Sequence, residues 1–152
     1  MSAGTRRWWH VMVDVAVPVV LCTLAMVPLA PTYDDARFWL AVAGGVGLGA
    51  GAALLTTRLR WGALETGVIA MAAYFAFGGL FALRESAIGG IVPSLATLRD
   101  LALGVVYGWK QLLTVNPPVN SFEQLYGVPY LAALIGTVLA VAFALRLRRP
   151  AV

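Results

Sequence analysis

Four long apolar runs constrain this chain more than any other feature of its sequence. They cover residues 9–29, 38–56, 63–83 and 128–145. A helix of about 20 apolar residues, rising ~1.5 Å per residue, crosses the ~30 Å hydrocarbon core of a bilayer. Each run is close to that length. The sequence therefore predicts an all-α membrane protein with four transmembrane helices.

Composition supports this class and excludes others. Hydrophobic residues make up 61% of the chain and charged residues only 12%, about half the ~25% charged fraction of soluble domains. No segment suggests a second, soluble core, so residues 1–152 are expected to form a single helical domain. The net charge is +4, but the basic residues stand beside the ends of apolar runs. Their expected partner is the lipid bilayer and not nucleic acid.

The distribution of Lys and Arg predicts the orientation. One side holds both termini and the turn after the second run, with seven basic residues: Arg6, Arg7, Arg58, Arg60, Arg146, Arg148 and Arg149. The other side holds four: Arg37, Arg84, Arg99 and Lys110. The positive-inside rule therefore places both termini in the cytoplasm and the connection 84–127 on the outer side of the membrane.

This connection begins with an amphipathic segment. Over residues 95–115, apolar residues recur at helical spacing, and they include Leu98, Leu101, Val105 and Trp109. We expect an interfacial helix on the outer face, with Trp109 turned toward the lipid or the bundle. The prolines that follow predict a loop. The expected outer-face platform comprises Trp109, Lys110, Pro117, Pro118, Phe122 and Tyr126, although a solvated loop can have the same composition.

The second run is rich in glycine. Gly45 and Gly49 are four residues apart, as are Gly47 and Gly51. Such spacing aligns small residues on one helix face and lets a neighbouring backbone approach closely. The pattern is not G-x-G-x-x-G and lacks a strand-turn-helix context, so helix packing is favoured over phosphate binding.

Two acids lie within the apolar runs. Asp14 and Glu65 are both expected near the cytoplasmic edge of the membrane, where Arg58 and Arg60 could neutralise them. An ionised carboxylate at this depth costs several kcal/mol unless it is paired or reaches the interface. A proton or ion relay is the alternative. Because neither acid approaches the bilayer centre, ion pairs between the first and third helices are favoured.

Residues suited to catalysis are sparse. Cys22 and His10 are the only cysteine and histidine, and twelve residues on one helix separate them by ~18 Å. They cannot form a nucleophile and base pair, and the carboxylates are not spaced to complete a histidine-based metal site. The sequence predicts no catalytic, cofactor or metal site in this chain.

One segment carries a family resemblance. The run G-W-K-Q-L-L-T-V-N-P-P-V, residues 108–119, follows three apolar runs and precedes another. It resembles the N-terminal membrane region of bacterial transglutaminase-like membrane proteins, particularly those of actinobacteria. The resemblance implies an anchor that precedes an extracytoplasmic domain with a Cys-His-Asp triad, and that triad has no counterpart in these residues. The resemblance therefore implies a non-catalytic, multi-pass anchor in the bacterial cell membrane, with an outer-face platform for a partner or for a missing C-terminal domain.

Two other functions fit the same sequence. The chain could be a small accessory subunit of a larger membrane complex, such as a transporter or respiratory assembly, bound through the glycine face of the second run. It could also be a transporter or channel itself. That reading is disfavoured, because no run is interrupted by polar residues at its middle.

Overall fold

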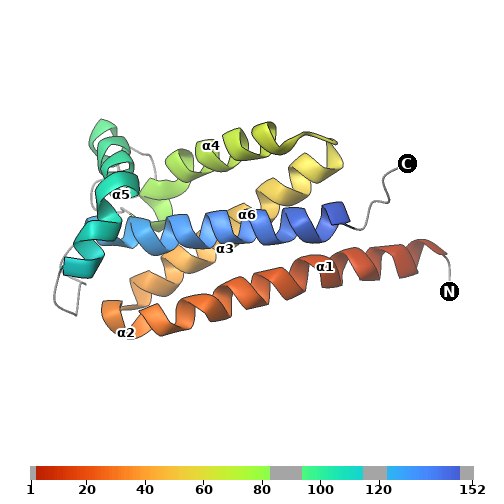
Figure 1. The fold of residues 1–152 in the computed structure, drawn as a ribbon, viewed down its shortest axis with the longest axis horizontal. Helices are drawn as coiled ribbons and strands as arrows, with labels where there is room; N and C mark the ends of the chain where they lie inside the picture. Colours follow the sequence, from red (N-terminus) through yellow and green to blue (C-terminus); the bar gives the residue numbers. More distant parts are fainter. Residues whose placement is uncertain (1–2, 83–93, 115–122, 148–152) are drawn as a thin grey trace.

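The computed structural model describes residues 3–82, 94–114 and 123–147, and every regular element in these ranges is a helix (Figure 1). Four helical segments are long and apolar enough to cross a membrane, Met12–Tyr33, Ala36–Arg58, Ala63–Phe81 and Gly127–Leu145. The predicted all-helical architecture with four helices of membrane-spanning length is confirmed in this part of the chain.

The first helical segment is longer than predicted. α1 (Ala3–Met26) continues through the short η1 (Val27–Leu29) into α2 (Ala30–Tyr33). The predicted end of the first run at residue 29 is therefore wrong, because the helical segment continues to Tyr33. Pro28 and Pro31 each lie in the first turn of a short helix. Proline has no backbone N–H, but an N–H in the first turn would have no acceptor within the helix, so no hydrogen bond is lost. The chain reverses at Asp34, which is left-handed with φ 47°.

Two helices form the centre of the bundle. α3 (Ala36–Arg58) packs along α6 (Gly127–Leu147), the most extensive helix contact in the described ranges. A Cβ added at Gly45 would lie 2.5 Å from the Tyr130 carbonyl oxygen, and one at Gly49 would lie 2.7 Å from that of Leu134. Both distances are too short for any side chain, so the two backbones approach closely only because these positions are glycine.

The other two glycines that were predicted to pack face elsewhere. A Cβ added at Gly47 or Gly51 would have no atom of the described chain within 4 Å, and both residues are exposed. The sequence grouped all four glycines as packing positions. The structure separates them into a pair against α6 and a pair on the bundle surface.

The outer helices lie on opposite sides of the central pair. α1 packs on α6 and, less extensively, on α3, whereas α4 (Ala63–Phe81) packs on α3 and α6 from the other side. Figure 1 shows α1 and α4 separated by α6. The bundle is therefore layered, with α1 and α4 as its outer layers.

α5 (Leu95–Thr114) crosses one end of this bundle, and its bounds agree with the predicted helix 95–115 (Figure 1). It contacts α4, α6 and the short η2 (Glu123–Tyr126). Its start is capped reciprocally: the Ser94 N–H donates to Thr97 Oγ1 at 3.2 Å, and the Thr97 N–H donates to Ser94 Oγ at 3.1 Å. This is a capping box with Thr in place of the usual Glu or Gln.

The two glycine pairs predict opposite effects of the same substitution. We expect Gly45→Ala or Gly49→Ala to destabilise the bundle by about 1–3 kcal/mol, because the new methyl group overpacks the contact with α6. Gly47→Ala and Gly51→Ala are the matched controls. They should leave stability unchanged or raise it, because alanine favours a helix over glycine. Thermal unfolding of the purified variants in detergent measures the difference, and equal effects for the two pairs would contradict this packing.

Candidate functional site

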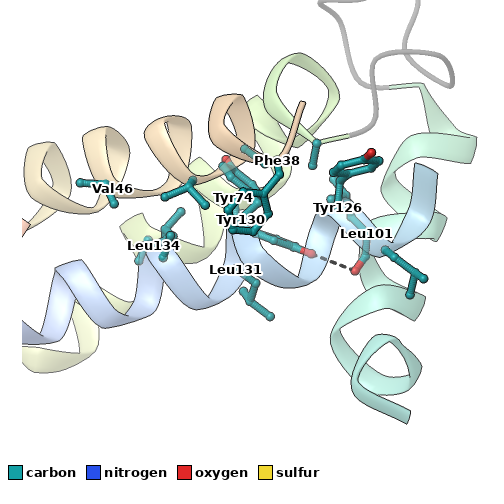
Figure 2. Packing of buried hydrophobic residues seen from close by; sticks show 14 of the residues in the cluster. Phe38, Val46, Tyr74, Leu101, Tyr126, Tyr130, Leu131 and Leu134 are labelled. Carbon is teal, nitrogen blue, oxygen red and sulfur yellow. Dashed lines mark hydrogen bonds between the residues drawn. The ribbon is translucent and has the colours of Figure 1, made fainter. Parts of the chain in front are cut away.

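Four buried tyrosines gather at the end of the bundle that α5 crosses. We call Tyr33, Tyr74, Tyr126 and Tyr130 the tyrosine cluster; each is at most 1% exposed. They come from α2, α4, η2 and α6, and three of them appear in Figure 2 with their neighbours. A buried phenol is costly unless its hydroxyl forms a hydrogen bond. Each of these hydroxyls has such a partner on another segment.

Three of the hydroxyls donate to backbone carbonyls. Tyr33 donates to the carbonyl of Leu125 at 3.0 Å, which joins α2 to η2. Tyr130 donates to the carbonyl of Ala73 at 3.3 Å, which joins α6 to α4. Tyr74 donates to the carbonyl of Leu101 at 3.2 Å, the bond drawn as a dashed line in Figure 2. This third bond attaches α5 to the membrane-length helix α4.

The fourth hydroxyl binds a carboxylate. Tyr126 Oη donates to Asp35 Oδ2 at 3.1 Å, while Asp35 Oδ1 accepts from the Arg37 N–H at 3.3 Å and caps α3. Arg37 Nε also lies 3.8 Å from Oδ2. Burial, followed by the hydrogen bond and charge of Asp35, raises the pKa of Tyr126 to about 12. The phenol therefore stays protonated and can donate at any physiological pH.

The rings of the cluster also stack. Tyr33 lies 5.1 Å from Phe38 and 5.3 Å from Tyr126, measured between ring centroids. Tyr74 and Tyr130 stack at 5.3 Å with an interplanar angle of 21°. Aromatic pairs at these separations add about 0.5–1.5 kcal/mol beyond their buried area. The cluster is therefore a densely packed junction of four segments.

Sequence reasoning missed this junction. Tyr126 was expected on the exposed platform, and that prediction is wrong: its side chain is buried, because Asp35, far away in sequence, accepts its hydrogen bond. Tyr33, Tyr74 and Tyr130 were not predicted as site residues. Two signals were available. An Asp directly before an apolar run predicts an N-cap, and a tyrosine within such a run needs an acceptor.

The rest of the expected platform is described in part. Lys110 is exposed on α5, and Trp109 lies in the same helix. Pro117, Pro118 and Phe122 lie outside the described residues. The packed side of α5 is formed by Thr97, Leu101 and Gly108, all buried. Gly78 of α4 leaves the space that Leu101 fills.

The opposite side of α5 is exposed and largely apolar. We call Leu95, Val106, Lys110 and Leu113 the α5 outer face; its leucines are 85% and 86% exposed and Val106 is 67% exposed. Leu101, in contrast, is in the core. Exposed apolar side chains grouped on one helix mark a contact with a membrane or a partner.

The acids and arginines that were expected to pair are distributed over two regions. Asp14 is half-buried on α1, whereas Glu65 is in the first turn of α4, on the other side of the central pair. A Cβ added at Gly62 would lie 2.7 Å from Glu65 Oε2, so this carboxylate folds back over the start of its own helix. Arg58 ends α3, and Arg60 follows in the turn. Ion pairing of Asp14 and Glu65 with these arginines stays a prediction.

The described side chains offer little to a metal or to a nucleophilic mechanism. Among them, no three His, Cys, Asp or Glu residues gather in a way that could hold a metal ion. Cys22 is half-buried on α1, and its Sγ would lie 3.9 Å from a Cβ added at Gly136 of α6. Its surroundings are those of a residue in a helix contact.

Comparisons of the chain with protein-family models, with curated proteins and with solved structures found no match. The geometry of the bundle is therefore the main indication of function. Its most distinctive feature is a capped helix that a buried hydrogen bond and side-chain packing hold across one end.

The Tyr126–Asp35 bond can be tested directly. We expect Tyr126→Phe to destabilise the protein by about 1.5–3 kcal/mol, the usual contribution of a hydrogen bond to a charged group. Tyr107→Phe is the matched control, because that tyrosine is 54% exposed on α5. A double-mutant cycle with Asp35→Asn, read by thermal unfolding in detergent, should show coupling between the two sites. Additive effects in this cycle would contradict the bond.

Proposed function

We propose that the chain is a non-catalytic membrane-embedded domain that acts as an anchor and presents α5 as an outer-face platform. The observation that supports this proposal most is the attachment of α5. A helix that served only as a connection would need no fixed position. α5, in contrast, is capped at its start, hydrogen-bonded to α4 and packed against α4 and α6. The four apolar helices supply the anchor, and the α5 outer face supplies the contact.

The contacts of α5 give the platform its rigidity. Leu101 is bound through its carbonyl by Tyr74 and fills the space left by Gly78. At Gly108 an added Cβ would lie 2.7 Å from Val128 Cγ2, so α5 and α6 are also close. With one side held in this way, the outer face keeps a defined position relative to the membrane helices. A preorganised surface binds with a smaller loss of conformational entropy.

The orientation and the partner extend this proposal. With both termini in the cytoplasm of a bacterial cell, α5 lies on the outside, as the Lys and Arg distribution predicts. The partner is then a separate extracytoplasmic protein, or an extracytoplasmic domain of the same polypeptide that would follow further membrane helices. The resemblance of residues 108–119 to transglutaminase-like membrane proteins supports the second of these partners, a domain of the same polypeptide. Any catalytic triad would lie in that domain.

Topology can be tested by thiol labelling. In a Cys22→Ala background, we expect Lys110→Cys to react with a membrane-impermeant maleimide on intact cells. Arg60→Cys should react only after permeabilisation, because the turn after α3 lies at the other end of the bundle (Figure 1). Both substituted residues are exposed. Labelling in the reverse order would place the platform in the cytoplasm and overturn the proposed orientation.

The platform itself can be tested by site-specific photo-crosslinking in native membranes. A crosslinker at Val106, on the α5 outer face, should capture an extramembrane protein domain. The matched control is Val68, which is equally apolar and exposed but lies on the membrane-length helix α4. It should yield lipid adducts. If both positions yield only lipid adducts, the proposed platform is contradicted.

The accessory-subunit alternative has its own structural support. Ala43, Gly47 and Gly51 form an exposed row of small residues on α3, at a spacing that admits a second helix. A crosslinker at Gly51 that captures another multi-pass protein, with no protein captured at Val106, would favour this alternative. Protein captured at Val106 alone would favour the anchor and platform.

A further inference from the structure

The turn between α3 and α4 has an unusual backbone. The Trp61 N–H donates to the carbonyl of Thr56 at 2.9 Å, and the Arg60 N–H donates to that of Thr57 at 3.3 Å. These two bonds define a Schellman motif that ends α3. Its left-handed position is normally glycine, because a Cβ is strained there. In this chain the position is Arg60, with φ 58°.

Glycine would end the helix at this position with less backbone strain. The chain instead has arginine, which places a guanidinium group at the turn. Arg60 is exposed, and so is Arg58, which lies two residues earlier at the end of α3. Backbone strain that persists in a native fold points to a function for the side chain involved. The negative end of the α3 dipole favours cations nearby, but Arg58, in the last turn, already meets that preference.

The surroundings of the two arginines suit a membrane surface. Leu59, Trp61 and Leu64 are exposed apolar residues of the same turn and of the first turn of α4. The nearby acid, Glu65, folds back over Gly62, where the start of α4 stabilises its charge. Two exposed cations are therefore flanked by an indole and two leucines at the end of two membrane-length helices.

We propose that this turn, Arg58 to Leu64, binds the phosphate of an anionic phospholipid headgroup. Guanidinium groups bind phosphate through charge-assisted, often bidentate hydrogen bonds. The exposed tryptophan suits the headgroup level of a membrane, and the exposed leucines offer apolar contact to a lipid. The site lies at the opposite end of the bundle from α5 (Figure 1), so it does not depend on the proposed platform.

Arg60→Gly separates binding from folding, because glycine adopts the left-handed conformation without strain. We expect this variant of the full chain, in a neutral detergent, to unfold at the same temperature as the wild type or higher. Its affinity for phosphatidylglycerol in mixed micelles, read from the lipid-dependent thermal shift, should fall at least fivefold. Arg60→Lys should bind with intermediate affinity, because it keeps the charge but loses the bidentate geometry.

Controls distinguish the source of the phosphate and the specificity of the turn. Arg99→Gln removes one exposed charge from α5 and should leave the affinity unchanged. Phosphatidylcholine and inorganic phosphate should each produce a much smaller shift than phosphatidylglycerol. Equal weakening by Arg99→Gln would show that net charge alone attracts the lipid and would overturn the site. Unchanged binding by Arg60→Gly, or an equal shift with either alternative ligand, would also overturn the proposal.

Discussion

The close approach of α3 and α6 is the contact on which the rest of this bundle depends. In lipid, apolar helices gain little from burying side chains against one another, so association depends on packing and on hydrogen bonds. Gly45 and Gly49 let the α6 backbone come within van der Waals contact of α3. α1 and α4 then pack on opposite sides of this pair. A side chain at either glycine would move both outer layers.

The tyrosine cluster completes the packing where backbone contact ends. Its hydroxyls link α2 and the start of α3 to η2, and link α4 to both α5 and α6. Each bond satisfies a polar group that burial would otherwise make costly. One of these bonds holds α5 to α4. The bundle thus has one end organised by buried phenols, with a helix across it. At the other end, a strained turn exposes two arginines.

Particular residues show how far the sequence could predict this arrangement. The helix over 95–115 was predictable, because its apolar residues recur at helical spacing, and Ser94 and Thr97 form a local cap. The burial of Tyr126 was not, because its acceptor Asp35 is 91 residues away. The extension of the first helix through Pro28 and Pro31 was also missed. The local sequence does not distinguish a proline in the first turn of a helix from a proline in a loop, because both positions tolerate it.

The sequence by itself determined the class of protein and the position of its helices along the chain. Lipid cannot satisfy backbone hydrogen bonds, so apolar runs of this length form helices whatever surrounds them. Only the tertiary structure decided which glycines pack, which tyrosines are buried and which side of α5 faces outward. Gly45 and Gly47 are equivalent in spacing and chemistry, and they differ only in what lies opposite them. That depends on contacts between segments distant in sequence, which no local pattern encodes.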